Sequence, residues 1–261
     1  MKIRMMSDIH YEMGAFYIEE MPDDKNTVLV LAGDIGLLEK AYTYVDFITE
    51  CCDQFKHVIF VYGNHEYYRG DWPYSHNKAV EHFKYLENIH FGYEFTAVVD
   101  DVAFICSTLW TNFNNGDASS MQAAKNSMND FRIIRTGPKE VPYLRKFDPI
   151  EAYKFHDKTL KFMAENITHY QEEGKKIIVV THHQPSLKSI NEKYIGTPDL
   201  NGAYVSDLEP FILEHKPSFW FAGHVHDSFN YFVGETNVIV NPTGYPMERN
   251  PKFNPRLTIE I

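Results

Sequence analysis

Five short apolar segments, each followed at once by side chains that can bind a metal ion, constrain this chain more than any other feature. The segments are residues 3–6, 28–32, 58–62, 177–181 and 219–222. Helical patterns lie between them at residues 37–55, 77–86, 150–171 and 206–215. This alternation predicts an α/β fold built on a substantially parallel sheet.

The polar residues that follow the five segments form short motifs. They are Asp8-Ile9-His10, Gly33-Asp34, Gly63-Asn64-His65-Glu66, His182-His183 and Gly223-His224-Val225-His226. Because ligands bind outside the carboxyl ends of the strands in open α/β sheets, the motifs predict one convergent site. Each motif alone is weak, but together they predict a metal centre. Carboxylate, imidazole and amide ligands suit Mn, Fe or Zn rather than Mg or Ca.

In this order the motifs resemble the five blocks of the calcineurin-like metallophosphoesterase superfamily. The blocks run from residue 8 to residue 226 and so cover nearly the whole chain. The resemblance implies a four-layer α/β/β/α sandwich with a dinuclear metal site at the carboxyl ends of the strands. With no repeat or linker in the sequence, we expect residues 1–261 to form a single domain of this type.

The resemblance also implies a role for each motif residue. One divalent ion would be bound by Asp8, His10 and His226. The second would be bound by Asn64, His182 and His224. Asp34 would bridge the two ions. His183 is an alternative to His182, which we favour because it lies nearer the strand end. His65 would protonate the leaving group or stabilise the transition state, and Glu66 is expected to orient its loop.

The implied activity is that of a metal-dependent phosphoesterase in which a metal-bridging hydroxide attacks the phosphorus. Ser/Thr protein phosphatases of the superfamily follow the bridging aspartate with Asp-Arg-Gly, whereas Ile35-Gly36-Leu37-Leu38 follows Asp34 here. The chain is more similar to short bacterial and phage phosphodiesterases. We therefore expect hydrolysis of a small phosphodiester, such as a cyclic nucleotide. The alternatives are a phosphomonoesterase or protein phosphatase, and a catalytically silent scaffold, which the five intact blocks disfavour.

Composition narrows the range of partners. The formal net charge is −11, from 36 acidic and 25 basic residues, which argues against broad binding to nucleic acid or to anionic membranes. Three cysteines form no disulfide framework, and no apolar stretch approaches membrane-spanning length. We expect a cytoplasmic protein whose partner is a small phosphate ester; no oligomeric state is predicted.

Residues 107–148 form the largest stretch without a clear pattern, and they are expected to be a lid or substrate wall, with a plain surface excursion as the open alternative. Residues 241–245 are a second candidate for closing the site. Tyr67 and Tyr68 are expected either to stack on a base or to pack against the sheet edge. Seven histidines outside the motifs are expected to be exposed: His57, His76, His82, His90, His156, His169 and His215.

Overall fold

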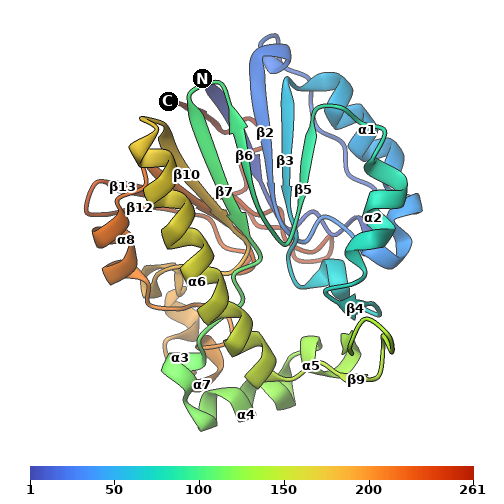
Figure 1. The fold of residues 1–261 in the computed structure, drawn as a ribbon, viewed down its shortest axis with the longest axis vertical. Helices are drawn as coiled ribbons and strands as arrows, with labels where there is room; N and C mark the ends of the chain where they lie inside the picture. The colour runs from blue at the N-terminus through green and yellow to red at the C-terminus, as the bar shows by residue number, and fades with distance from the viewer.

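The computed structural model describes residues 1–261 and places two mixed β-sheets face to face (Figure 1). The five-stranded sheet has the order β14-β1-β2-β3-β5. Its parallel strands are β1 (Lys2–Met6), β2 (Thr27–Ala32), β3 (His57–Val61) and β5 (Ile89–Gly92). The edge strand β14 (Thr258–Glu260) runs antiparallel to β1.

The six-stranded sheet has the order β12-β13-β11-β10-β7-β6. Its parallel strands are β7 (Val102–Ser107), β10 (Lys176–Thr181), β11 (Phe219–Ala222) and β13 (Thr236–Val240). The antiparallel edges are β6 (Glu94–Val99) and β12 (Phe229–Val233). A small third sheet joins β4 (Asp71–Trp72), β8 (Arg135–Thr136) and β9 (Arg145–Lys146).

Helices cover the outer face of each large sheet. Helices α1 (Val45–Gln54) and α2 (His76–Phe83) lie on the five-stranded sheet, and α6 (Pro149–Glu172) and α8 (Glu209–His215) lie on the other (Figure 1). Between the sheets, an apolar core includes Val30, Ile59, Phe104 and Val180. The predicted four-layer α/β/β/α arrangement is confirmed. No helix is both long and apolar enough to cross a bilayer.

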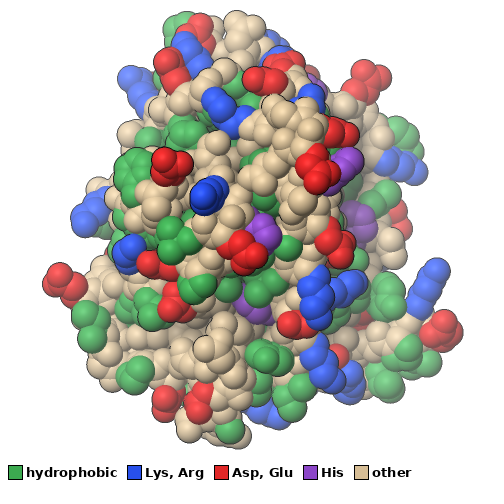
Figure 2. Space-filling model, turned by 60° about the vertical axis from the view of Figure 1, so that its left-hand side comes forward, with side chains coloured by type: hydrophobic (Ala, Val, Ile, Leu, Met, Phe, Trp, Pro, Cys, Tyr) green, Lys and Arg blue, Asp and Glu red, His purple; other side chains and the backbone are tan.

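Shorter elements complete the chain. The remaining α-helices are α3 (Phe113–Gly116), α4 (Ala118–Ser127), α5 (Asp130–Ile133) and α7 (Pro198–Asn201), which gather at one end of the molecule (Figure 1). The 3-10 turns are η1 (Tyr11–Met13), η2 (Asp24–Asn26), η3 (Leu38–Thr43), η4 (His65–Tyr67), η5 (Leu187–Ser189) and η6 (Glu192–Tyr194). Lys and Arg side chains are interspersed with Asp and Glu over the face in Figure 2.

Three expectations from the sequence need correction. Residues 37–55 are not one helix, because the backbone breaks at Tyr44, whose buried ring packs against Gly36. Residues 107–148 contain three helices and two short strands rather than irregular chain. His156 is buried rather than exposed: neither ring nitrogen has a hydrogen-bond partner, and burial lowers its pKa to about 4, so the ring is neutral.

The Glu66 carboxylate joins the loop after β2 to the loop after β3. One oxygen, Oε2, accepts N–H groups of Asp34 and Gly63 at 2.9 and 2.6 Å. The other, Oε1, accepts N–H groups of Ile35 and Gly36 at 2.7 and 3.1 Å. Glu66 is fully buried, so these four donors have no water to replace the carboxylate. Glu66 therefore holds the two loops in register, as the sequence suggested.

We predict that Glu66→Gln lowers the free energy of unfolding by about 1–3 kcal/mol. The amide would place an NH2 group where one carboxylate oxygen accepts two backbone N–H groups, and those donors would be left buried and unpaired. Urea unfolding measures the loss, with Glu81→Gln on the exposed face of α2 as the matched control. Equal unfolding midpoints for Glu66→Gln and wild type would show that this carboxylate does not hold the loops.

Candidate metal centre

The predicted ligands come together at the carboxyl ends of five strands. Asp8 and His10 follow β1, Asp34 follows β2, Asn64 follows β3, His182 follows β10, and His224 and His226 follow β11. All are buried except His226, whose side chain keeps 21% of its surface exposed. Residues distant in the sequence therefore share one polar site at the edge of the sheets.

The backbone at this site is unusual. Five of the predicted ligands have left-handed conformations: Asp8 (φ 55°), His10 (φ 52°), Asp34 (φ 57°), His224 (φ 73°) and His226 (φ 54°). Such conformations are uncommon for residues with a side chain and cluster at functional sites. Close packing adds to the constraint, because a Cβ atom on Gly63 would lie 2.2 Å from Asp34 Oδ1. The surrounding sheets thus impose the positions of the side chains.

Asp8, His10 and His226 form a first group of candidate ligands. Their ligand-capable atoms all lie within 4.8 Å of one another. The Nε2 atom of His226 lies 3.0 Å from His10 Nε2 and 3.3 Å from Asp8 Oδ1. Two imidazole nitrogens and one carboxylate oxygen therefore converge on one point.

Asp34, His182 and His224 form a second group of the same kind. Asp34 Oδ1 and Asn64 Oδ1 lie 3.2 and 3.0 Å from His182 Nε2. The other oxygen of the aspartate, Oδ2, lies 3.9 Å from His10 Nε2 in the first group. One carboxylate therefore presents one oxygen to each group.

Hydrogen bonds around His182 show that this donor set fits a cation. His182 Nδ1 donates to the carbonyl of Ala32 at 2.9 Å, which leaves a lone pair on Nε2 in the neutral ring. Asn64 Nδ2 donates to Asp130 Oδ1 at 2.7 Å, so its Oδ1 also faces the centre as an acceptor. Three acceptors then meet with no donor among them. A bound divalent ion would satisfy them all.

Two further observations support the fit. His224 Nε2 is buried without a hydrogen-bond partner, although it points into the second group. Burial alone would lower the pKa of His182, but the Asp34 carboxylate raises it to about 10. In the metal-free protein His182 is therefore protonated, and its positive charge lies where a metal ion would bind. The side chains present therefore suit a pair of cations.

His183 occupies a different position from His182. Its Nδ1 lies 3.0 Å from the carbonyl of Thr108, and its ring packs 4.3 Å from the ring of His224 and 5.2 Å from that of Trp110. His183 belongs to neither group of candidate ligands. The choice between the two histidines stays a prediction, and this geometry favours His182.

His65 lies beside the first group and is held from three sides. Its Nδ1 is 2.9 Å from Glu12 Oε1, its Nε2 is 3.3 Å from the Tyr245 hydroxyl, and its ring stacks on Tyr68 at 4.0 Å. His65 also groups with His10 and Asp34 as a third set of ligand-capable atoms. Geometry alone therefore allows a ligand role as well as the predicted catalytic one.

The sequence analysis did not identify Glu12 or Asp130, which support the site from outside the five motifs. Burial alone would raise the pKa of Glu12, but hydrogen bonds to His10 and His65 lower it to about 2. The available signal for Glu12 was a carboxylate two residues after a predicted ligand. Asp130 lies in α5, far from any motif, and had no such signal.

Of the two tyrosines that follow Glu66, Tyr67 is buried in the core, whereas Tyr68 packs on His65.

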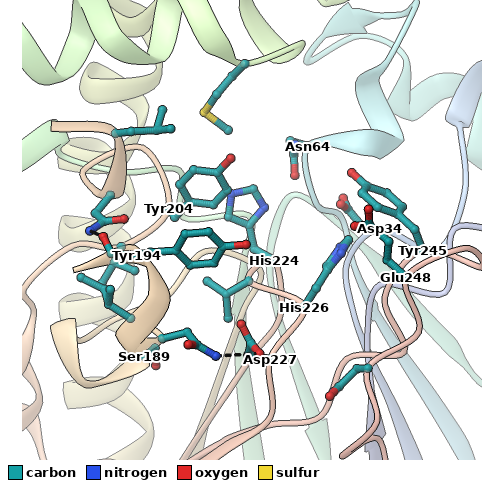
Figure 3. A pocket seen from close by; sticks show the side chains of 18 of the residues that line it. Asp34, Asn64, Ser189, Tyr194, Tyr204, His224, His226, Asp227, Tyr245 and Glu248 are labelled. Atoms are coloured by element: carbon teal, nitrogen blue, oxygen red, sulfur yellow. Dashed lines mark hydrogen bonds between the residues drawn. The ribbon is translucent and has the colours of Figure 1, made fainter. Parts of the chain in front are cut away.

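A pocket of about 520 Å³ opens beside the cluster of candidate metal ligands. Tyr194 and Tyr204 form one side, and Asn64, Asp34 and Tyr245 lie across from them (Figure 3). Residues 127–129, from the segment 107–148, complete the lining together with residues of 189–205, 224–227 and 245–251. The pocket is therefore much larger than a phosphate group alone requires.

The pocket carries few free positive charges. Lys193 and Arg249 are its only lysine and arginine. The Lys193 ammonium lies 3.5 Å from Asp227 Oδ2, and the Arg249 guanidinium lies over the ring of Phe16, 5.7 Å from its centre. The pocket lining therefore holds one lysine that is paired with a carboxylate and one arginine that packs on an aromatic ring.

The chain is similar to proteins already known. A protein of Acanthamoeba polyphaga mimivirus is 28% identical over 286 residues, which covers 99% of this chain and 96% of the relative. The structure resembles a phosphopantetheinyl hydrolase from Mycobacterium tuberculosis (TM-score 0.65, 12% identity, 94% of this chain and 90% of the other). It also resembles a dimetal phosphatase from Danio rerio (TM-score 0.52, 12% identity, 94% and 87%). These identities are so low that the two likenesses show the fold alone.

A family model described as calcineurin-like phosphoesterase matches residues 1–228, which contain all five motifs and every candidate ligand. This match covers most of the chain. The protein belongs to the calcineurin-like phosphoesterase family and is a hydrolase of phosphate esters.

Proposed function

We propose that this protein hydrolyses a small phosphodiester with the help of two divalent ions, of which Mn, Fe and Zn suit the ligands best. Asp8, His10 and His226 would bind one ion. Asn64, His182 and His224 would bind the other. The observation that carries the proposal is the Asp34 carboxylate, whose two oxygens face the two groups separately. A bridging carboxylate of this kind lets two ions approach to about 3.5–4 Å.

When bound, such a pair of ions supplies Lewis acidity toward the phosphoryl oxygens and a nucleophilic water at neutral pH. The residues of the chain would hold the ions in position and donate a proton to the leaving group. Strand ends hold the ligands rigidly, which supports an in-line geometry. His65 Nε2 faces Asp34 Oδ2 at 3.9 Å, so a proton on this nitrogen could reach the leaving oxygen of a bound ester.

Charge favours a diester over a monoester. A phosphomonoester carries a charge close to −2 near neutral pH, whereas a diester carries −1. The pocket offers little positive charge for the extra negative charge of a monoester, since Lys193 pairs with Asp227 and the single arginine, Arg249, lies over Phe16. A chain with net charge −11 adds a repulsive background.

Pocket size favours an ester with two organic groups. The cavity of about 520 Å³ leaves room beside the phosphate. Tyr204 already stacks on the ring of His224, but the exposed ring of Tyr194 presents aromatic surface on which a ring such as a nucleobase could stack, consistent with a cyclic nucleotide or similar diester. Residues 127–129 would act as part of a substrate wall.

All three cysteines are buried and unpaired, which fits the reducing conditions of the cytoplasm.

We predict that the Mn²⁺-loaded protein hydrolyses bis-p-nitrophenyl phosphate with a kcat/KM at least about tenfold above that for p-nitrophenyl phosphate, since about 1.4 kcal/mol of repulsion is tenfold in rate. Dialysis against EDTA should abolish both activities, and Mn²⁺ should restore them. Faster turnover of the monoester would support the phosphomonoesterase alternative. Two bound ions with no turnover of either ester would support the silent scaffold.

We predict that Asp34→Asn does more damage than Asp8→Asn. Loss of a bridging carboxylate removes negative charge from both ion sites, whereas loss of Asp8 affects one. Metal stoichiometry from elemental analysis, measured beside kcat, should show Asp34→Asn losing more metal and more activity. If Asp34→Asn keeps two tightly bound ions and near-normal turnover, another residue bridges them.

We predict that alanine substitutions of the neighbouring residues Asn64 and His65 lower activity in different ways. Asn64→Ala should loosen one ion, so that added Mn²⁺ recovers part of the activity. His65→Ala should keep both ions yet lose about 10²–10⁴ in kcat, the usual contribution of a positioned general acid. In His65→Ala, kcat should fall more on methyl phenyl phosphate than on methyl p-nitrophenyl phosphate, because p-nitrophenolate leaves without a proton.

The control for both variants is His169→Ala, which removes an exposed histidine at the end of α6. It should change neither metal content nor kcat. Metal loss in His65→Ala would identify this residue as a ligand. An equal loss of rate on both esters would identify it as a binding contact rather than an acid.

A further inference from the structure

Glu12 contacts two histidines of the site at once through a single oxygen. Its Oε1 lies 2.9 Å from His65 Nδ1 and 3.3 Å from His10 Nδ1. The side chain is only 12% exposed, and its second oxygen is buried without a hydrogen-bond partner. A carboxylate placed this way is aimed at the two rings and at nothing else.

The backbone fixes where Glu12 can reach. It lies in η1 (Tyr11–Met13), directly after His10. The N–H groups of His10 and Tyr11 donate to the carbonyls of Asp34 and Ile35 at 2.9 and 2.8 Å. This short turn is therefore attached to the loop that carries the proposed bridging aspartate, so Glu12 cannot move independently of the site.

No other carboxylate is free to pair with His65 Nδ1. Glu66 is occupied by four backbone N–H groups, and Asp130 accepts from Asn64. Asp34 lies on the Nε2 side of the His65 ring, at 3.9 Å. The four residues after Asp34, where related protein phosphatases carry another aspartate, are Ile-Gly-Leu-Leu here.

We propose that Glu12 is a positioning residue for His65, an inference that rests on the proposed function of the site. By accepting a hydrogen bond from Nδ1–H, Glu12 sets the rotation of the ring and directs Nε2 toward the bound ester. The proton given to the leaving oxygen is then carried on Nε2, while Glu12 keeps its own state throughout. This is the logic of a histidine oriented by a carboxylate on its far nitrogen.

The activity test compares Glu12→Ala, Glu12→Gln and His65→Ala on methyl phenyl and methyl p-nitrophenyl phosphate. Glu12→Ala should lower kcat on the phenyl ester by about 10–100-fold, the usual effect of losing a partner that orients a histidine. The p-nitrophenyl ester should lose less. Glu12→Gln should lose less than Glu12→Ala, because an amide oxygen can still accept from Nδ1–H. Glu20→Ala, an exposed glutamate on the same segment, is the control.

A double-mutant cycle separates the two histidines that Glu12 touches. If Glu12 acts through His65, Glu12→Ala should have no further effect on kcat in the His65→Ala background. If it acts through His10, the loss should persist in that background and metal affinity should fall with it. That second result would overturn the proposal.

A measurement without turnover keeps the inference separate from the proposed function. In Zn²⁺-loaded protein labelled with ¹⁵N-histidine, long-range ¹H–¹⁵N spectra should show a hydrogen-bonded proton on His65 Nδ1, assigned by comparison with His65→Ala. In Glu12→Ala the Nδ1 signal of His65 should lose the chemical shift that this hydrogen bond gives it. Unchanged His65 signals would contradict the role of Glu12 even if the protein is an active phosphodiesterase. Absence of all phosphoesterase activity would refute the proposed function while leaving this test intact.

Discussion

The contacts of the Asp34 carboxylate with the two groups of imidazoles are the interaction on which the rest of the site depends. Its oxygens face different groups, and Oδ1 also accepts the backbone N–H of His65 at 2.9 Å. The Asp34 N–H in turn donates to Glu66. If the proposed function is right, substrate chemistry, metal affinity and the position of His65 all depend on where this one side chain is held.

Backbone strain explains why a rigid two-sheet fold is needed to hold it. Five of the seven predicted ligands have left-handed backbone conformations, each of which costs of order 1–3 kcal/mol outside glycine. Such conformations persist only where the surroundings over-determine them. Here the parallel strands supply that constraint, because each loop starts from a buried strand end and Glu66 ties two of the loops together. Glycine is required where the loops approach most closely, as at Gly63 beside Asp34.

The strands and the predicted ligands could be read from the sequence because both follow one local rule, an apolar run that ends in polar residues. The four layers came from the family resemblance and are confirmed by the two sheets and their covering helices. The side chains that orient the ligands could not be read in this way. Asp130 reaches Asn64 from 66 residues away along the chain, and only the folded structure brings them together. The prediction that His156 is exposed was wrong for a related reason. Its charged neighbours in the sequence gave no sign that its face of α6 packs inward.

The central claim is that Asp34 bridges two metal ions, and anomalous diffraction from crystals of the Mn²⁺-loaded protein tests it most directly. Two anomalous peaks should appear about 3.5–4 Å apart, one next to His10 and His226 and the other next to His182 and His224, with an oxygen of Asp34 on each. A single peak, or two peaks with Asp34 bound to only one of them, would contradict the account.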